Sequence, residues 1–333
     1  MRVQPLLFPI LFLPAFASAI TVDDGSTQGR TYEGIGAVSA GASSRLLFDY
    51  PDPIRSDILD YLFKPKFGAG FQHLKVEIGG GENSTCGSEP SHAITRAELT
   101  APVGTRGYEF WLAKEARDRN PGIILDGLAW CHPYWFSTLW SQDQADYIIA
   151  FLDAAKSAWG LDWEWIGACK NKRGYNRDWI VNTLRPSLNK KGYADIKLHA
   201  AEVIASDWSI ADALAGDASF SAALDAISVH YPSRAENRTP PASARNWGKP
   251  LWANEEWSRS GSTWSNSILL ARNINMLYIR DLISKHSIWC PIDAIYGPIS
   301  GSGASEVPIR YASTGAMRAD MPWSGHYEIY SAT

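Results

Sequence analysis

Short apolar runs alternate along the chain with longer segments whose apolar residues recur at helical spacing. Residues 71–78, for example, form an apolar run of strand length, whereas residues 53–63 repeat with the period of a helix. The apolar runs predict eight strands, at residues 32–40, 71–78, 122–130, 163–168, 196–203, 226–230, 250–255 and 287–291. The segments between them predict helices at residues 53–63, 104–119, 142–159, 176–189, 208–224 and 267–284.

Eight strands separated by room for helices predict an α/β fold, the parallel (β/α)8 or TIM barrel. A doubly wound open sheet is the alternative. In a barrel of this kind, the C-terminal ends of the strands form the functional site. Ordinary solvation also places charges at the ends of apolar runs, so the prediction of a pocket depends on many such residues converging. These strand-end residues are Glu77, Trp130, residues 168–172, Glu202, His230, Glu255 and Trp289.

Residues 1–19 have the pattern of a secretory signal peptide. A cation precedes an apolar run at residues 6–16, and small residues follow as a cleavage site. We therefore expect one barrel domain over residues 20–333, in the secretory pathway and then outside the cell or in the vacuole or lysosome. No stretch approaches the ~20 apolar residues of a membrane-spanning helix, so no transmembrane segment is predicted.

Composition narrows the classes of function. The formal net charge is −4 and no basic block occurs, so a nucleic-acid partner has no support. The 15 Trp and 14 Tyr residues favour sugar binding only weakly, because most such rings simply pack. The spacing of the 4 Cys residues leaves the disulfide pairing open and does not match a zinc site, so no cofactor or metal ion is predicted. Sequons at Asn83 and Asn237 predict glycosylation.

The candidate for chemistry is the stretch at residues 249–258, which reads Lys-Pro-Leu-Trp-Ala-Asn-Glu-Glu-Trp-Ser. An apolar run ending in carboxylates predicts a buried strand that delivers Glu255 to a pocket. The alternative is that Glu255 and Glu256 lie on a solvated rim. Retaining glycoside hydrolysis needs a second carboxyl group about 5–5.5 Å from the first. The end of the fourth predicted strand, at residues 166–176, contains no carboxylate.

Longer segments carry a resemblance to a known family. They are Tyr-Glu-Gly-Ile-Gly-Ala-Val-Ser at 32–39, Ile-Leu-Asp-Tyr-Leu-Phe-Lys-Pro-Lys-Phe-Gly at 58–68, Leu-Lys-Val-Glu-Ile-Gly-Gly at 74–80 with Glu-Pro-Ser-His at 89–92, and Pro-Trp-Ser-Gly-His-Tyr at 322–327. Through them the chain resembles glycoside hydrolase family 59, the galactocerebrosidase family, and in particular its fungal members. The resemblance implies a retaining β-galactosidase that hydrolyses galactosylceramide-type glycosphingolipids. It makes a galactosylated sphingolipid the expected substrate and a lipid-presenting activator protein a candidate partner.

The resemblance also implies roles for individual residues. Glu255 matches the family's nucleophile. His230 matches a histidine at the end of the sixth strand, for which a core histidine bonded to neighbouring strand ends is the alternative. The positions matched to substrate-binding residues are Thr85, Trp130, Lys170, His230, Ser258, Trp289 and Tyr311.

The match breaks at the end of the fourth predicted strand. The family reads Ile-Gly-Ile-Trp-Asn-Glu-Lys there, whereas residues 166–172 read Ile-Gly-Ala-Cys-Lys-Asn-Lys. Asn171 thus stands at the position of the acid/base Glu, and Lys170 stands at that of the preceding Asn. An amide cannot protonate a leaving alkoxide, and such help typically contributes ~10²–10⁴-fold in rate. Glu164 is expected within the strand and too far from the scissile bond.

A second departure concerns the C-terminus. Family members continue into a closing helix, a β-sandwich and a lectin-like domain, for which the residues after Tyr327 leave no room. We therefore expect either that the chain stops short of its natural end or that residues 327–333 pair elsewhere. The resulting hypotheses are an impaired galactosylceramidase-type hydrolase, a non-catalytic galactoside or glycolipid binder, and a truncated inactive product.

Overall fold

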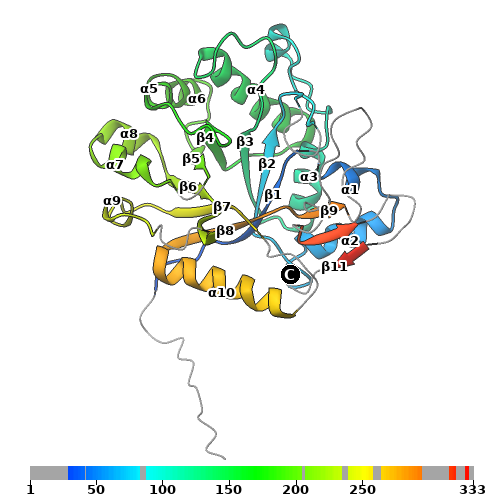
Figure 1. Cartoon of the computed structure of the whole chain (residues 1–333). Helices are drawn as coiled ribbons and strands as arrows, with labels where there is room; N and C mark the ends of the chain where they lie inside the picture. Colours follow the sequence, from blue (N-terminus) through cyan, green and yellow to red (C-terminus); the bar gives the residue numbers. More distant parts are fainter. Residues whose placement is uncertain are drawn as a thin grey trace, which may run out of the picture. The chain divides into compact units, whose positions relative to one another are not determined.

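Eight parallel strands close into a barrel in the computed structural model of this protein (Figure 1). Each strand pairs with the next, and β1 closes the barrel on β8, with Gly34 opposite Lys285 and Val38 opposite Trp289. The predicted (β/α)8 barrel is confirmed, and the open sheet is wrong. The strands are β1 (Gly34–Ser39), β2 (His73–Ile78), β3 (Ile124–Ala129), β4 (Trp165–Lys170), β5 (Lys197–Val203), β6 (Ala226–His230), β7 (Leu251–Trp257) and β8 (Ile283–Trp289).

Residues Tyr32–Thr333 group into one compact unit. The predicted signal peptide lies outside the residues that the structure describes. None of the described helices is both long enough and apolar enough to span a membrane. The described residues are 29–41, 43–82, 88–204, 207–234, 239–257, 264–294, 315–319 and 327–329.

Helices surround the barrel strands (Figure 1). The helix predicted at residues 142–159 coincides with α4 (Gln142–Trp159), which buries an apolar face that includes Tyr147 and Phe151. Gly160 ends α4 in the left-handed conformation, at φ 65°. The other helices are α1 (Arg45–Asp49), α2 (Ile54–Phe63), η1 (Arg96–Thr100), α3 (Glu109–Arg119), α5 (Arg177–Trp179), η2 (Ile180–Leu184), α6 (Arg185–Lys190), α7 (Ser209–Ala215), α8 (Ala218–Ala223), η3 (Pro232–Arg234), α9 (Ala242–Arg245) and α10 (Trp264–Asp281).

Two predicted helices are divided into shorter pieces. The segment at 176–189 consists of α5, the π-helical η2 and α6. The segment at 208–224 consists of α7 and α8, because Asp217 begins a new helix there. Its side chain caps α8 by accepting a hydrogen bond of 2.9 Å from the Phe220 N–H.

The predicted boundary between the last helix and the eighth strand is wrong. α10 stops short of its predicted end, and β8 begins at Ile283 rather than at residue 287. Leu282 separates them in the left-handed region, at φ 62°. The start of β8 lacks an apolar run because Lys285 and Ser287 are polar, although both are fully buried. The polar interior of the barrel accommodates them.

A small three-stranded sheet follows the barrel in sequence. β10 (Met317–Ala319) pairs in parallel with β9 (Ile292–Ala294) and antiparallel with β11 (Tyr327–Ile329). Residues 293–319 are rich in Gly, Ser and Pro, which predicts a loop, and β9 and β10 correct that prediction at its two ends. The residues from 295 to 314 lie outside the described part of the chain. The three-residue strands are too short to show a periodic pattern. The pairing of β11 agrees with the expectation that the last residues pair elsewhere.

The barrel interior is polar, whereas the apolar core includes residues of both the strands and the surrounding helices. Buried charges are normally tolerated only when they are paired. The interior side chains therefore need partners across the barrel. Charged or ionisable side chains with no exposed surface include Lys75, Asp126, His199, Glu202 and Lys285.

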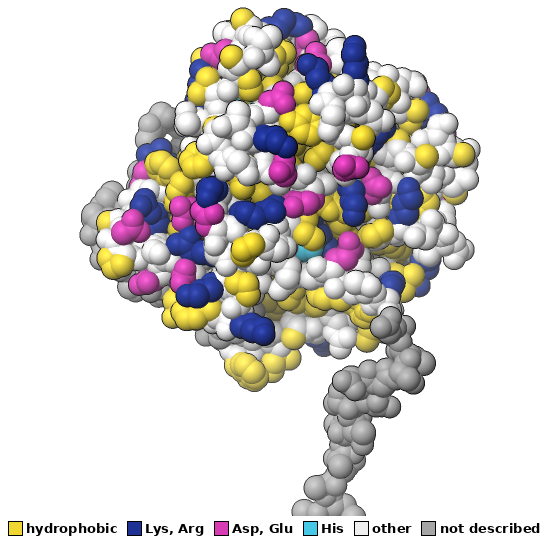
Figure 2. Space-filling view, turned by 180° about the vertical axis from the view of Figure 1, so that it is seen from behind, with side chains coloured by type: hydrophobic (Ala, Val, Ile, Leu, Met, Phe, Trp, Pro, Cys, Tyr) yellow, Lys and Arg dark blue, Asp and Glu magenta, His cyan; other side chains and the backbone are white. Residues whose placement is uncertain are grey.

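The surface carries charges of both signs. On the face drawn in Figure 2, Lys and Arg side chains are interspersed with Asp and Glu. This mixture agrees with the formal net charge of −4 and with the absence of a basic block from the sequence.

Candidate active site

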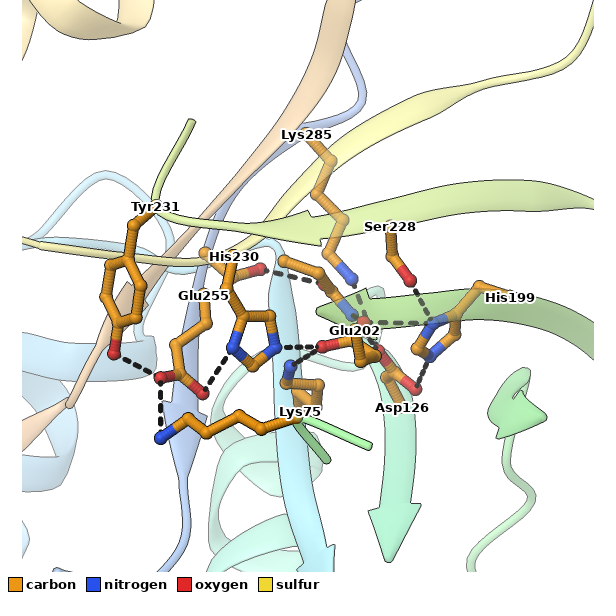
Figure 3. Close-up of polar contacts among 12 residues, drawn as sticks. Lys75, Asp126, His199, Glu202, Ser228, His230, Tyr231, Glu255 and Lys285 are labelled. Atoms are coloured by element: carbon orange, nitrogen blue, oxygen red, sulfur yellow. Dashed lines mark hydrogen bonds and ion pairs between the residues drawn. The ribbon is translucent and has the colours of Figure 1, made fainter. Parts of the chain in front are cut away.

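Glu255 is a buried carboxylate near the C-terminal end of β7. Only 1% of this residue is exposed, and Glu256 beside it is fully buried. The alternative of a solvated rim is therefore wrong. The pairing of β7 with β6 and β8 shifts register near Glu255, and such irregularities re-aim side chains. Figure 3 shows the Glu255 carboxylate between Tyr231 and His230.

Three side chains approach the Glu255 carboxylate. The Tyr231 hydroxyl donates a hydrogen bond to Oε1. The Lys172 Nζ lies 3.9 Å from the same oxygen, and the His230 Nδ1 lies 3.5 Å from Oε2. Burial raises the pKa of Tyr231 far above its ordinary value, and the charge of Glu255 adds to the shift. Tyr231 therefore keeps its proton and serves as a donor to Glu255.

His230 connects Glu255 to a second carboxylate. The ring is fully buried, and its Nε2 is hydrogen-bonded to Glu202 Oε2 (Figure 3). The sequence left open a pocket histidine or a core histidine bonded to neighbouring strand ends. The structure shows the bonded arrangement, with one ring nitrogen facing Glu255 and the other bonded to the end of β5, and a role for His230 in substrate binding stays a prediction.

Glu202 is the centre of a polar network that fills the barrel interior. Its carboxylate accepts hydrogen bonds from Lys75 Nζ at 2.9 Å and from Asn254 Nδ2 at 2.7 Å. Burial by itself would raise the pKa of Glu202, but Lys75 and His230 outweigh this effect. The pKa of Glu202 is held well below its ordinary value, so the carboxylate stays ionised. The interior network comprises Lys75, Asp126, His199, Glu202, Asn254 and Lys285.

Asp126 is the second anion of the interior network. It lies 2.9 Å from His199 Nε2 and 3.5 Å from Lys285 Nζ. Burial opposes its ionisation, but the charges of His199 and Lys285 prevail and lower the pKa of Asp126. The network thus places two lysines against two carboxylates inside the barrel. This balance lets charged groups hold His230 in place beneath Glu255.

The strand-end pattern predicts Glu202 but no other member of the interior network. Each of the others lies within a predicted strand or shortly before one, where a charged or polar residue interrupts the apolar run. The sequence of β2 nevertheless contains a pattern that indicates the network, because Lys75 and Glu77 alternate with Leu74 and Val76. Side chains of period two point to one face of a strand, which here is the barrel interior.

The turn after β4 brings a lysine, not a carboxylate, to Glu255. Lys172 adopts the left-handed conformation at φ 61°, and 41% of its side chain is exposed. Asn171 is only 8% exposed, and its Oδ1 has no hydrogen-bond partner among the described residues. Backbone hydrogen bonds fix the turn, from the N–H of Lys170 to the carbonyl of Gly174, from Asn171 to Ala129, and from Lys172 to Glu202.

The remaining predicted substrate-binding residues divide into two groups. Trp130 follows β3 and is buried, with the Lys75 Nζ 5.3 Å from its ring centroid. Trp289 is the last residue of β8, and Lys170 is the last residue of β4. Both tryptophans thus lie at strand ends, where the barrel predicts the site. Three predicted residues lie outside the described part of the chain, namely Thr85, Ser258 and Tyr311.

Glu164 lies at the opposite end of β4 from Asn171. It precedes the strand rather than lying within it as predicted. Its carboxylate pairs with Arg117 at 2.8 Å and accepts a hydrogen bond from the Leu125 N–H. The expectation that Glu164 does not serve the site therefore agrees with its position.

Three of the cysteines are buried. They are Cys131, Cys169 and Cys290, whereas Cys86 lies outside the described residues. Burial raises the pKa of Cys169 well above its ordinary value, so this thiol stays protonated. Cys169 lies in β4, shortly before the turn that carries Asn171, and is buried in the apolar core.

A second group of buried carboxylates, the acidic cluster, consists of Glu77, Glu89 and Glu109. Glu77 accepts a hydrogen bond of 2.7 Å from the Gly41 N–H. Glu89 accepts one from the Tyr108 N–H, and Glu109 accepts two from serine hydroxyls. Burial is the main reason that the pKa values of Glu89 and Glu109 lie well above normal, and charge repulsion within the cluster adds to it. Both carboxyls therefore favour the protonated form.

The fold and the buried carboxylate together define a class of protein. A closed (β/α)8 barrel with a glutamate, a tyrosine and a histidine at neighbouring strand ends has the architecture of a barrel enzyme. The sequence model of glycosyl hydrolase family 59 matches residues 32–332, so the chain belongs to this family. The predicted resemblance is confirmed.

Curated relatives extend beyond the matched region. Galactocerebrosidase from Homo sapiens is 39% identical over 335 residues, which cover 98% of this chain and 45% of that protein. Galactocerebrosidase from Danio rerio is 37% identical over 331 residues, covering 96% of this chain and 46% of that protein. The chain thus spans less than half the length of these relatives.

Solved structures share the barrel at low sequence identity. SrfJ from Salmonella typhimurium has a TM-score of 0.71 at 12% identity, covering 91% of this chain and 73% of that one. The catalytic domain of xylanase C from Talaromyces cellulolyticus has a TM-score of 0.66 at 16% identity, covering 91% and 74%. At these identities the likeness shows the fold alone.

Proposed function

We propose that this chain is a retaining β-galactosidase domain that acts on galactosylceramide-type glycosphingolipids, with Glu255 as its nucleophile. Family membership and the names of the relatives support the substrate class. The observation that carries the proposal is the Glu255 carboxylate itself, which is buried at a strand end and bonded by Tyr231. A nucleophile of this kind must be oriented and kept ionised by its neighbours.

Glu255 and its neighbours can perform the first chemical step. One carboxylate oxygen attacks the anomeric carbon and forms a galactosyl-enzyme, which water later resolves. Tyr231 orients Oε1 and balances its charge by donating a hydrogen bond. His230 lies against Oε2 and is itself held by Glu202, so the carboxylate is positioned before substrate arrives.

The second step of the proposal concerns the leaving group. Asn171 stands where the acid/base glutamate is expected and has no acidic proton to donate. We expect the chain to be impaired by ~10²–10⁴-fold on a ceramide alkoxide, because that leaving group needs a proton. Leaving groups that depart as stable anions escape this penalty.

The pocket residues follow from the same proposal. The galactose ring is expected to contact Trp130, Lys170, His230 and Trp289 at the strand ends. Thr85, Ser258 and Tyr311 complete the proposed set from outside the described residues. A lipid-presenting activator protein as partner, and a secreted or vacuolar/lysosomal location, belong to the proposal as well.

Covalent labelling tests the nucleophile. The wild-type protein is incubated with 2,4-dinitrophenyl 2-deoxy-2-fluoro-β-D-galactoside, whose leaving group needs no proton. Mass spectrometry is expected to find the fluorogalactosyl group on the peptide that contains Glu255. Glu255→Gln should remove the label, and Glu164→Gln should retain it, because Glu164 lies at the other end of its strand. A folded wild-type chain that takes no label, or takes it elsewhere, contradicts the proposal.

Restoring the missing carboxylate tests the leaving-group argument. Asn171→Glu is expected to raise the rate on galactosylceramide in mixed micelles by ~10²–10⁴-fold. Asn171→Gln, which adds the same length without an acidic proton, should give no increase. Equal rates for the two variants would show that position 171 is not the acid/base position.

A second candidate function is a non-catalytic galactoside binder. The observation that favours it is Lys172, a cation near Glu255 where a proton donor is needed. Calorimetric binding of galactose by a chain that takes no covalent label would favour the binder. Absence of both binding and label, with a collapsed near-UV circular dichroism spectrum, would indicate an inactive product.

A further inference from the structure

Carboxylates and imidazoles alternate along a row of side chains that crosses the barrel interior, which we call the polar row (Figure 3). At its first end, Glu255 Oε2 lies 3.5 Å from the Nδ1 of His230, whose Nε2 is bonded to Glu202 Oε2. The other oxygen of Glu202 lies 3.1 Å from the Nδ1 of His199, and the His199 Nε2 lies 2.9 Å from Asp126 Oδ1. The polar row therefore connects Glu255 on β7 with Asp126 on β3.

His199 lies between two carboxylates of the polar row. A neutral imidazole has one N–H and can donate to only one of two flanking carboxylates, whereas an imidazolium donates to both. Burial by itself would lower the pKa of His199, but the charges and hydrogen bonds of Asp126 and Glu202 outweigh burial and raise the pKa. Geometry and charge together make His199 a buried cation.

The other contacts of His199 in the described part of the chain are uncharged. Its Nδ1 also lies 2.8 Å from the Ser228 Oγ on β6. The Trp252 ring on β7 lies 5.6 Å from the imidazole, measured between ring centroids. On β4, Gly167 approaches the imidazole without a side chain. The charge of His199 is therefore compensated by the carboxylates of the polar row.

The charges of the polar row and its lysines balance when His199 is positive. Lys75 Nζ lies 2.9 Å from Glu202 Oε2, and Lys285 Nζ lies 3.5 Å from Asp126 Oδ2. His199 and these two lysines give three positive charges against the three carboxylates of the row. Loss of the His199 charge would leave two positive charges against three negative ones, and a buried charge without a partner favours neutralisation by a proton.

Glu255, or His230 beside it, would take up that extra proton. Lys172 lies 3.9 Å from Glu255, but 41% of its side chain is exposed, so water screens its charge. Tyr231 donates a hydrogen bond to Glu255 but carries no charge, and Glu256 is a second buried carboxylate next to it on β7. The other two carboxylates of the polar row each retain a buried lysine. A proton on either member of the Glu255–His230 pair weakens the nucleophile.

We propose that His199 is a positioning residue for the nucleophile, whose positive charge keeps an extra proton off the Glu255–His230 pair. His199 acts through Glu202 and His230 and does not touch the substrate. The inference rests on the proposed function, because it concerns the reactivity of Glu255 as a nucleophile. It adds that the lower pH limit of the reaction is set in the barrel interior.

The pH dependence of covalent labelling tests this role. Wild type and variants react with 2,4-dinitrophenyl 2-deoxy-2-fluoro-β-D-galactoside from about pH 4 to pH 8, and release of dinitrophenolate is followed. This leaving group needs no proton and Asn171 has none to donate, so the fall in rate at low pH reports the nucleophile alone.

His199→Gln should move the midpoint of this fall upward by about 1 pH unit, because a positive charge is lost from the row. Below both midpoints, labelling should be about 10-fold slower than in wild type, and above them the rates should converge. A purely structural defect would instead lower the rate by the same factor at every pH.

Two further variants separate charge from packing. His199→Lys restores a cation between the carboxylates and should return the midpoint toward that of wild type. His92→Gln makes the same exchange at a buried histidine whose Nε2 binds the Tyr147 carbonyl. Burial lowers the pKa of His92 to about 3, so the exchange removes no charge and should leave the midpoint unchanged. A midpoint for His199→Lys that matches His199→Gln overturns the proposal.

Nitrogen-15 NMR of the labelled histidines measures the charge of His199 in the wild-type protein, whether or not a variant folds. At pH 7.5 we expect an imidazolium with protons on both ring nitrogens, although an ordinary histidine of pKa ~6.5 is neutral there. The signal should disappear in His199→Lys. Absence of an imidazolium from wild type at this pH, or its persistence in the variant, overturns the proposal.

The outcomes separate this inference from the proposed function. If Glu255 takes the label but His199→Gln has the wild-type midpoint, the role of His199 fails and the nucleophile stands. If the folded wild-type protein takes no label, the nucleophile proposal fails, and the role of His199 fails with it.

Discussion

The pKa values of two groups of buried carboxylates in this protein are shifted in opposite directions. Glu202 and Asp126 of the interior network have lowered pKa values, whereas Glu89 and Glu109 of the acidic cluster have raised ones. Burial opposes ionisation in both groups. The difference is the counter-charge, because lysines contact the network carboxylates, whereas backbone N–H groups and hydroxyls bind Glu89 and Glu109.

The comparison explains how each group serves the fold. Ionised carboxylates in the interior network pair with cations and fix His230 against Glu255. Protonated carboxyls in the acidic cluster can share hydrogen bonds without needing a cation. The stabilities of variants in the two groups should therefore respond differently when charge or pH is changed.

The largest effect is expected from breaking the network at its centre. Glu202→Ala leaves Lys75 buried without its carboxylate, and loss of one partner of a buried pair typically costs about 3–5 kcal/mol. Urea unfolding at neutral pH measures the change in the free energy of unfolding. Asp195→Asn, at an exposed site, should change it by less than ~0.5 kcal/mol. A loss below ~1 kcal/mol for Glu202→Ala would mean that the network charges are not coupled as described.

His286 is a buried ionisable group that has no counter-charge among the described residues. Neither ring nitrogen has a hydrogen-bond partner in the same part of the chain, and burial lowers the pKa of His286 to about 4. The histidine therefore contributes stability above the unfolded pKa of ~6.5, which is lost as pH falls toward the folded value. His286→Leu cannot titrate, so relative to wild type it should gain about 2 kcal/mol between pH 7 and pH 5.

Unfolding at the two pH values measures this gain directly. Any pH-independent packing cost of His286→Leu cancels in the difference. Other buried histidines, such as His73 with its pKa lowered to about 3, remain in both proteins and cancel too. Parallel pH curves for the variant and wild type would show that His286 is hydrated or bonded in solution.

The smallest effect is expected from the acidic cluster. The raised pKa of Glu109 means that its contribution to stability is present below the unfolded value of ~4.3 and is lost as pH rises through the folded value. Glu109→Gln mimics the protonated carboxyl and does not titrate. Its free energy of unfolding relative to wild type should therefore increase from pH 4.5 to pH 7.5.

Urea titrations across this range, with Asp195→Asn as the exposed control, measure the slope. If the stability of Glu109→Gln relative to wild type instead falls as pH rises, the pKa of Glu109 is lowered rather than raised. An undetected cation near the cluster would then be needed to explain it. If the stability difference between Glu109→Gln and wild type does not change with pH, Glu89 rather than Glu109 has the raised pKa.

The sequence predicted the barrel because strand and helix lengths alternate, and α4 was predicted to its end residues because its apolar face is continuous. It also predicted that Glu255 lies on a strand. It could not predict β8 correctly, because the buried Lys285 is paired with Asp126 on another strand, a contact that the local sequence does not reveal. The approach of Lys172 to Glu255 depends on a left-handed turn, which no periodicity reveals.

The pairing of β1 with β8 sets the order in which this protein can assemble. Glu33, just before β1, accepts a hydrogen bond from Ser284 Oγ across 251 residues of sequence. A ribosome adds roughly 5–20 residues per second, so the edge of β1 waits on the order of 10–50 s for its partner. During that time the edge can pair wrongly, and the interior charges lack their complete set of partners. The barrel around Glu255 can therefore close only after β8 has been synthesised, and its yield in a cell depends on protection of the nascent chain.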